Sequence, residues 1–77
     1  MAARKLPLMH AVDSSAIRAI GYQPSGQSLY IAYRGARGVY AYDDVTPEEW
    51  QALLDAESKG RFVNFRIKPR HAFTKVG

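Results

Sequence analysis

Two consecutive elements are predicted by the stretch Val39-Tyr40-Ala41-Tyr42-Asp43-Asp44-Val45-Thr46-Pro47-Glu48-Glu49-Trp50. In a β-strand, alternate side chains point to the same face, so residues 39–43 predict a strand that presents both of its tyrosines on one face. Thr46, Pro47 and Glu49 then have the spacing of an N-cap, a first-turn proline and a capping-box glutamate. The stretch therefore predicts a strand that leads directly into a helix.

Two further strands are predicted before this stretch, over residues 16–22 and 28–34. The second alternates cleanly, so one of its faces is expected to be buried. The first alternates imperfectly, because Ile17 and Ile20 would fall on opposite faces of a regular strand. Either both faces are partly covered, or a β-bulge near Ala19 corrects the phase. A turn at residues 23–26 and a glycine-rich loop would join the three strands into an antiparallel meander.

The predicted helix covers about residues 47–57 and carries an apolar stripe of Trp50, Leu53 and Leu54. This stripe is expected to cover the buried face of the sheet, since no other predicted element precedes or follows the strands with a comparable stripe. Gly60 is predicted to end the helix in the left-handed conformation that glycine adopts without strain.

Residues 61–68 fit two kinds of secondary structure. Residues 64–68 alternate as a strand would, whereas Phe62, Val63 and Ile67 also fit a short helix. Pro69 is expected to terminate either element. The pattern alone therefore leaves both alternatives open.

Several short motifs follow one another along the chain: Ser14-Ser15, Tyr40-Ala41-Tyr42, Val45-Thr46-Pro47 and Ser58-Lys59-Gly60-Arg61-Phe62-Val63-Asn64. Their order resembles that of the KTSC domain family, which occurs at the C-terminus of some lysyl-tRNA synthetases and as stand-alone bacterial or phage proteins. The resemblance covers residues 12–68 and implies a short second helix at 61–67, and RNA binding as the function suggested for the family. Lys68 departs from the family pattern, in which arginine is commoner.

The resulting expectation is an α+β fold, in which a three-stranded antiparallel meander is followed by one amphipathic helix and a short second helix on the same face. Residues 1–11 would form an irregular lead, and residues 69–77 a basic tail. A length of 77 residues accommodates one domain, and a 47% hydrophobic composition is typical of a folded chain.

Composition also limits the classes of function. The chain contains no cysteine, so disulfides and thiolate metal sites are excluded. His10 has no second ligand at metal-binding spacing, and we expect neither a metal nor a cofactor. No apolar run has the length of a signal peptide or a membrane span, so we expect a cytoplasmic protein.

Catalytic residues are not indicated. Ser14, His71 and Asp13 could be assembled into a nucleophile, a base and an acid, but serines in this context are usual in turns. The paired carboxylates at 43–44 and 48–49 are better explained as turn and helix-dipole residues. We therefore expect a protein that is not an enzyme.

Charge is distributed in blocks along the chain. The net charge is +4, and residues 43–57 carry six acidic and no basic side chains, whereas residues 58–77 carry six basic and no acidic ones. One interpretation is charge compensation on a solvated surface. The other is a basic face that attracts a polyanion and lies away from the acidic helix.

On the second interpretation, the most probable ligand class is RNA or another polyanion, bound through phosphate contacts and stacking on tyrosines. Burial of one or both of Tyr40 and Tyr42 beneath the helix, with the hydroxyls reaching the rim, is favoured over stacking on bases. Lys59 is also explained as a partner of the helix dipole. The candidate binding residues are Arg34, Arg37, Tyr40, Tyr42, Lys59, Arg61, Arg66, Lys68 and Arg70.

Two other functions remain open. A protein-interaction adaptor, of phage or bacterial kind, would use an exposed apolar patch that includes Leu6, Leu8, Met9 or Phe73. Alternatively, the glycine-rich basic loop at residues 34–38 would capture a small anionic nucleotide, although a hairpin turn explains that loop better.

Overall fold

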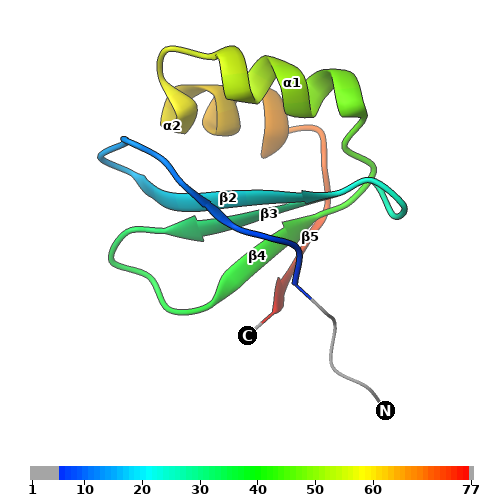
Figure 1. The fold of residues 1–77 in the computed structure, drawn as a ribbon, viewed down its shortest axis with the longest axis horizontal. Coiled ribbons are helices and arrows are strands. Elements are labelled where there is room, and N and C mark those ends of the chain that lie inside the picture. Colours follow the sequence, from blue (N-terminus) through cyan, green and yellow to red (C-terminus); the bar gives the residue numbers. More distant parts are fainter. Residues whose placement is uncertain (1–5, 77) are drawn as a thin grey trace.

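A five-stranded antiparallel sheet forms one layer of the molecule, and helices cover one of its faces (Figure 1). The computed structural model describes residues 6–76, so residues 1–5 of the predicted lead and the last residue of the predicted tail lie outside the described residues. The strands have the spatial order β1-β2-β3-β4-β5. In chain order the elements are β1 (His10–Ala11), β2 (Ile17–Gln23), β3 (Ser28–Tyr33), β4 (Val39–Tyr42), α1 (Pro47–Asp55), α2 (Lys59–Phe62), the π-helical segment η1 (Val63–Ile67) and β5 (Phe73–Val76).

The predicted meander is confirmed by the antiparallel pairing of β2 with β3 and of β3 with β4. Of the two explanations left open for the imperfect alternation, the β-bulge is present, because the register of β2 against β3 shifts between Ile17 and Ala19. The extra residue turns both Ile17 and Ile20 toward the helices, where both side chains are fully buried. A local irregularity in the sequence pattern thus marks a real irregularity in the strand.

The prediction of only three strands is wrong. β1 pairs with β2 at one edge of the sheet, and β5 pairs with β4 at the other. β1 is only two residues long, and β5 lies in the segment predicted as a tail. β5 returns to the sheet after both helices, so its partner is about 35 residues distant and no local pattern reveals the pairing.

The beginning of α1 follows the sequence prediction. Thr46 accepts a hydrogen bond from the backbone of Glu49 at 3.1 Å, and the Glu49 carboxylate accepts one from the backbone of Thr46 at 3.0 Å. Leu53 is fully buried, and the ring of Trp50 stacks on that of Tyr22 in β2 with centroids 5.4 Å apart. These contacts place the helix across the sheet.

The end of α1 differs from the prediction. The helix ends at Asp55 and is capped by Ala56, so Gly60 does not terminate it. Instead the Lys59 ammonium donates to the carbonyls of Leu54 and Ala56 at 3.0 and 2.7 Å, which satisfies acceptors at the end of the helix. Gly60 lies inside α2, where a Cβ would approach that of Ala16 to 3.2 Å. This glycine therefore serves close packing rather than a left-handed turn.

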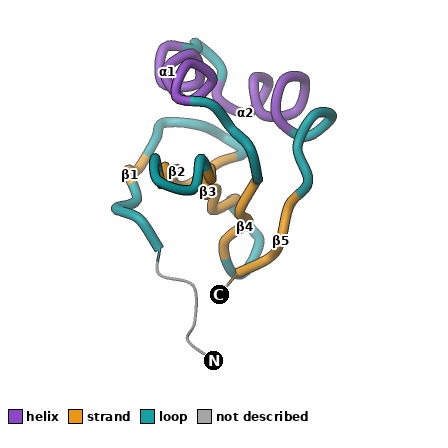
Figure 2. Tube along the Cα trace, turned by 90° about the vertical axis from the view of Figure 1, so that its right-hand side faces the viewer, coloured by secondary structure: helices purple, strands orange, loops and turns teal. Residues whose placement is uncertain are grey.

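The second helix is confirmed, and the strand alternative for residues 64–68 is wrong. α2 continues into η1, in which the amide of Lys68 donates to the carbonyl of Val63 at 2.9 Å. Val63 and Ile67 are fully buried against the sheet, whereas Phe65 is 69% exposed. Figure 2 shows α1 and α2 side by side above the strands.

Within residues 6–76, no helix is long and apolar enough to cross a membrane.

The sheet is also covered on its second face. Tyr30 and Ala41 lie directly opposite each other in β3 and β4, point away from the helices and are buried. Gly21 is the neighbour of Tyr30 in β2, and a Cβ at this glycine would meet the Sδ of Met9 at 2.7 Å and the carbonyl oxygen of Leu8 at 2.8 Å. The segment before β1 therefore crosses this face against the bare backbone of Gly21.

Replacing Gly21 by alanine is expected to lower the free energy of unfolding by about 1–3 kcal/mol, since the added methyl group would displace the backbone of Leu8. Urea denaturation monitored by circular dichroism measures this change. Gly26→Ala is the matched control, because its new Cβ would meet only the hydroxyl of Ser28 at an ordinary 3.5 Å. Equal stability of the two variants would contradict the close approach of the lead to the sheet.

Candidate binding pocket and basic end

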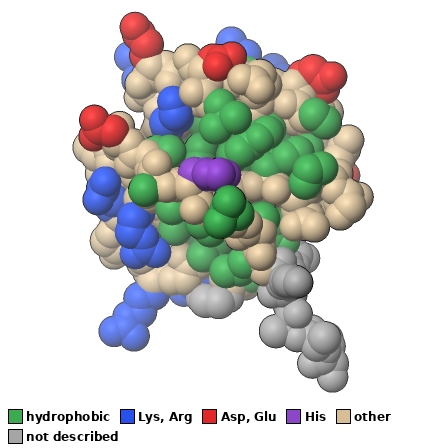
Figure 3. Space-filling view, viewed as in Figure 1, with side chains coloured by type: hydrophobic (Ala, Val, Ile, Leu, Met, Phe, Trp, Pro, Cys, Tyr) green, Lys and Arg blue, Asp and Glu red, His purple; other side chains and the backbone are tan. Residues whose placement is uncertain are grey.

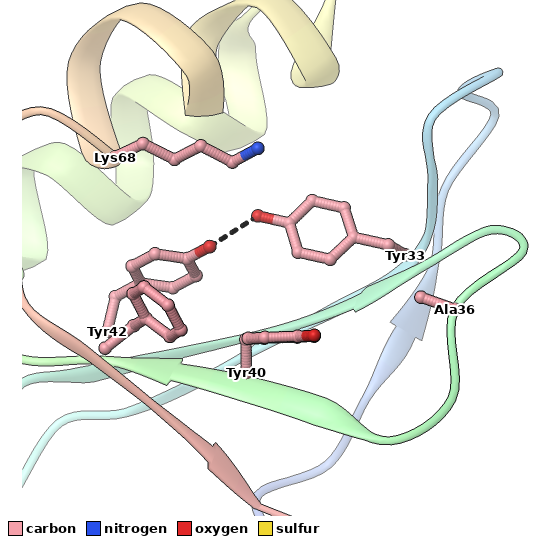
Figure 4. A pocket seen from close by; sticks show the side chains of 6 residues that line it. Tyr33, Ala36, Tyr40, Tyr42 and Lys68 are labelled. Atoms are coloured by element: carbon pink, nitrogen blue, oxygen red, sulfur yellow. Dashed lines mark hydrogen bonds between the residues drawn. The ribbon is translucent and has the colours of Figure 1, made fainter.

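A pocket of about 370 Å³ opens between the sheet and the end of η1 (Figure 4). Its walls come from four parts of the chain: the end of β3, the β3–β4 loop, the paired strands β4 and β5, and the residue after η1. The lining residues are Tyr33, Ala36, Tyr40, Tyr42, Lys68 and Phe73.

The aromatic walls of the pocket follow from strand alternation and register. Tyr40 and Tyr42 point to the helix-covered face of β4, and β5 places Phe73 directly opposite Tyr42. The Tyr40 ring lies 5.6 Å from Tyr33 in an edge-on arrangement and 5.6 Å from Phe73, measured between centroids. Four aromatic rings therefore surround one space.

Two phenol hydroxyls meet inside this aromatic group. The hydroxyls of Tyr33 and Tyr42 are 2.6 Å apart and share a hydrogen bond. Burial is the main cause that raises the pKa of each phenol, and the hydrogen bond to Tyr42 raises the pKa of Tyr33 further. Both hydroxyls are therefore neutral at physiological pH and act as hydrogen-bonding groups.

Lysines supply the charge at this site. The Lys68 ammonium lies 5.1 Å from the centroid of the Tyr33 ring, in cation–π geometry, and extends across the pocket in Figure 4. Lys75 is the strand partner of Tyr40, so its exposed side chain projects from the same face of the sheet. No carboxylate belongs to the lining within the described chain. The pocket is thus aromatic and electropositive.

Most of the predicted cations gather at one end of the molecule, which we call the basic end. The Nε of Arg34 donates to the carbonyl of Ser14 at 2.6 Å, and Gly60 contacts the same β1–β2 loop, so this loop, the β3–β4 loop and α2 meet there. Lysine and arginine side chains collect along this edge, and acidic ones lie mainly along the helices in Figure 3. The residues of the basic end are Arg34, Arg37, Arg61, Arg66 and Lys68.

Within residues 6–76, the cations of the basic end form no direct ion pair, although Asp13 belongs to the same β1–β2 loop. Among residues 6–76, the single contact within 4.0 Å between a basic and an acidic side chain joins His71 to Glu49, and no lysine or arginine forms an ion pair. Arg37 and Arg61 are exposed, and the guanidinium of Arg66 lies 6.0 Å from the centroid of the Phe62 ring. Internal charge compensation by direct ion pairs therefore does not describe this surface.

Two predicted cations lie outside the basic end. Lys59 is held by carbonyls at the end of α1, as its interpretation as a helix-dipole partner anticipates. Arg70 lies in the turn between η1 and β5, next to His71, whose ring contacts Asp43 and Glu49. Neither side chain joins the surface around the pocket.

The predicted tyrosines are less accessible than stacking on a flat sheet would require. Tyr42 is 2% exposed and belongs to the core, as the favoured burial interpretation expects, while Tyr40 is half-buried at the pocket. Two further residues line the pocket: Tyr33, which is not a candidate in the sequence, and Phe73, which is a candidate only for a protein-docking patch. The alternation of β3 indicates that Tyr33 points to the buried face of the sheet. No comparable pattern indicates the position of Phe73, because the sequence does not predict β5.

His71 joins the start of β5 to the start of α1. Its Nδ1 lies 2.7 Å from the carbonyl oxygen of Asp43 and its Nε2 lies 2.9 Å from the Glu49 carboxylate. Both partners are hydrogen-bond acceptors, so a ring nitrogen that carries a hydrogen can donate to either of them. The Ser14 hydroxyl is engaged elsewhere, because it accepts hydrogen bonds from the backbone amides of Ala16 and Ile17. His71 is thus a structural clamp.

Glu49→Gln is expected to lower the free energy of unfolding at pH 7 by about 1–2 kcal/mol, through loss of its charged hydrogen bonds. Burial raises the pKa of Glu49, but hydrogen bonds from Thr46 and His71 outweigh this effect and leave the pKa below its ordinary value. The carboxylate therefore stabilises the fold above the unfolded-state pKa, and this contribution is lost as the pH falls through the folded-state pKa.

Thermal unfolding of wild type and Glu49→Gln between pH 7 and pH 2 tests this expectation. The acid-induced loss of stability should be smaller in the variant. The exposed Glu48 makes no recorded side-chain hydrogen bond among the described residues, so Glu48→Gln is the control for loss of one negative charge. Identical acid profiles for wild type and Glu49→Gln would contradict the prediction.

The fold and pocket define a small α+β domain with a helix-covered antiparallel sheet. This chain belongs to the KTSC domain family, whose sequence pattern matches residues 13–71. It is similar to a protein of Tsukamurella paurometabola, with 50% identity over 62 residues that cover 80% of this chain and 91% of the relative. It is also similar to a protein of Stutzerimonas stutzeri, with 43% identity over 61 residues that cover 79% of this chain and 84% of the relative.

A solved structure has the same architecture. The crystal structure of a KTSC domain protein from Yersinia pestis matches with a TM-score of 0.85 and 37% identity, covering 91% of this chain and 97% of that chain. The names of these relatives state no activity, ligand or partner. The match confirms the resemblance drawn from the short motifs.

Proposed function

We propose that this protein is a non-enzymatic module that binds single-stranded RNA, with phosphates contacting the basic end. The observation that carries the proposal is the concentration of lysine and arginine side chains, none of them in an ion pair within residues 6–76, where two loops and α2 meet. Such a surface attracts phosphates independently of sequence. A pocket with aromatic walls opens beside it, which favours a strand with accessible bases over a duplex.

The adaptor alternative finds less support. Leu8 is 78% exposed but belongs to the segment that crosses the second face of the sheet, whereas Phe73 is 58% exposed on the helix-covered face. Met9 is partly buried near Gly21. Phe73 therefore lies on the opposite face of the sheet from Leu8 and Met9, so the predicted apolar residues do not share one docking surface.

Fluorescence anisotropy with a labelled single-stranded oligoribonucleotide tests the proposal. For four phosphate contacts, the affinity should fall roughly 50-fold when the salt concentration rises from 50 to 200 mM. An interaction that is dominated by phosphate contacts requires this dependence of affinity on salt concentration. No binding at 50 mM salt, or binding that is indifferent to salt, would refute RNA binding through the basic end.

A further inference from the structure

We infer that the aromatic pocket is a subsite for one nucleobase together with its phosphate. The inference rests on the proposed function when the base belongs to an RNA strand, but a free nucleotide offers the same chemistry. The base would lie among the rings of Tyr33, Tyr40 and Phe73, and its phosphate would face the lysines at the pocket rim.

The size and walls of the pocket suit a flat ring. Its volume of about 370 Å³ lies at the lower end of the range of sites for small molecules, roughly 300–1,000 Å³. Tyr40 meets Tyr33 and Phe73 at centroid distances of 5.6 Å with inclined rings, so each wall offers a different face or edge to the space between them. A planar heteroaromatic ring can contact several of these walls at once.

The charge of the site excludes the usual alternative for an aromatic cage. Such cages commonly hold a quaternary ammonium group over their rings. Here the Lys68 ammonium already lies over Tyr33 at 5.1 Å, and the lining within the described chain holds no carboxylate to offset a second cation. A cationic ligand would be repelled, whereas a ligand that carries a phosphate would be attracted.

The phenol pair distinguishes a base from a purely apolar ring. When the hydroxyls of Tyr33 and Tyr42 share one hydrogen bond, one of the two hydroxyl hydrogens is left to donate to a further acceptor. The raised pKa of both phenols keeps them protonated donors. Carbonyl oxygens and ring nitrogens of nucleobases are acceptors of the required kind, and hydrocarbon rings have none.

Tyr40→Leu and Phe73→Leu remove one aromatic wall each while keeping apolar bulk. In anisotropy titrations, each should weaken binding of an oligoribonucleotide roughly tenfold, since stacking contributes most of the affinity for a base. Tyr40→Phe keeps the ring and should bind as wild type does. Binding of an abasic ribose-phosphate oligomer of equal length should not change in any variant. Phe73 is exposed, so its variant separates loss of the wall from loss of the fold.

Titration of AMP and UMP, followed by NMR, examines the free nucleotide. The ring signals of Tyr33 and Tyr40 should shift on binding, whereas those of Tyr22, stacked on Trp50, should not. Equal affinity of wild type for the abasic and base-containing oligomers, with no shift at Tyr33 or Tyr40, would overturn the pocket inference and leave salt-dependent RNA binding standing. Nucleotide shifts without binding of any oligomer would support the pocket and overturn the RNA proposal.

Discussion

Leu53→Ala should lower the free energy of unfolding by about 2–5 kcal/mol, because it removes a fully buried side chain and leaves a cavity between α1 and the sheet. Domains of this size have little stability to lose, so this single change should move the thermal midpoint by many degrees. Thermal and urea unfolding, followed by circular dichroism, measure the effect.

Leu54→Ala provides the matched control on the same helix. Leu54 is 37% exposed, so its truncation removes less buried surface and should cost at most about 1 kcal/mol. The two leucines are equivalent in the sequence pattern, and only the orientation of α1 separates them. If both substitutions destabilised the protein equally, α1 would have to lie on the sheet at a different rotation.

The double variant Arg37→Gln/Arg61→Gln should weaken binding to single-stranded RNA by roughly 30-fold at low salt, if each cation contributes about 1 kcal/mol of phosphate contact. Both side chains are exposed and neither forms an ion pair within residues 6–76, so the fold should be unaffected. The slope of affinity against salt concentration should also decrease, because fewer counterions are released.

Arg70→Gln removes one charge from the turn beside His71 and serves as the reference, compared with Arg37→Gln alone. Arg70 is outside the basic end, so its loss should weaken RNA binding less than the loss of Arg37. Thermal unfolding of all variants checks that the fold is intact. Comparable losses for Arg37 and Arg70 would mean that net charge, and not the basic end, governs binding.

Local chemistry made the central part of the fold predictable from the sequence. The capping box at Thr46 and Glu49 depends only on residues three apart, so both the spacing and the helix start could be read directly. The phase error between Ile17 and Ile20 likewise indicated the bulge in β2. Both features depend on residues that are close together in the chain, so the local sequence pattern indicates them.

Long-range pairing made the rest unpredictable. β5 is four residues long, and its position depends on docking against β4 after two helices have crossed the sheet. Because Phe73 enters the pocket through that pairing, the sequence does not indicate that it is one of the four rings around the pocket. Tyr40 and Lys68 are both candidates in the sequence, but no local pattern indicates that they line the same pocket.

Gly60 shows a different limit of the sequence. A glycine after a helical pattern commonly marks a helix end, yet here the requirement is the 3.2 Å approach to Ala16 from another element. The ammonium of Lys59 takes over the capping that glycine would have provided. A glycine that is required for close packing and a glycine that is required for a left-handed turn look the same in the sequence.

The unbroken strand order from β1 to β5 has a kinetic consequence. Every strand pair except β4–β5 is joined by a short connection. Each of these pairs can therefore form its hydrogen bonds soon after its turn forms. The ladder between β4 and β5 must wait until α1, α2 and η1 have bridged the gap, since closure of that long loop is entropically costly. Folding of this chain should therefore end when β5 pairs with β4. The same step brings Phe73 next to Tyr40 and Tyr42.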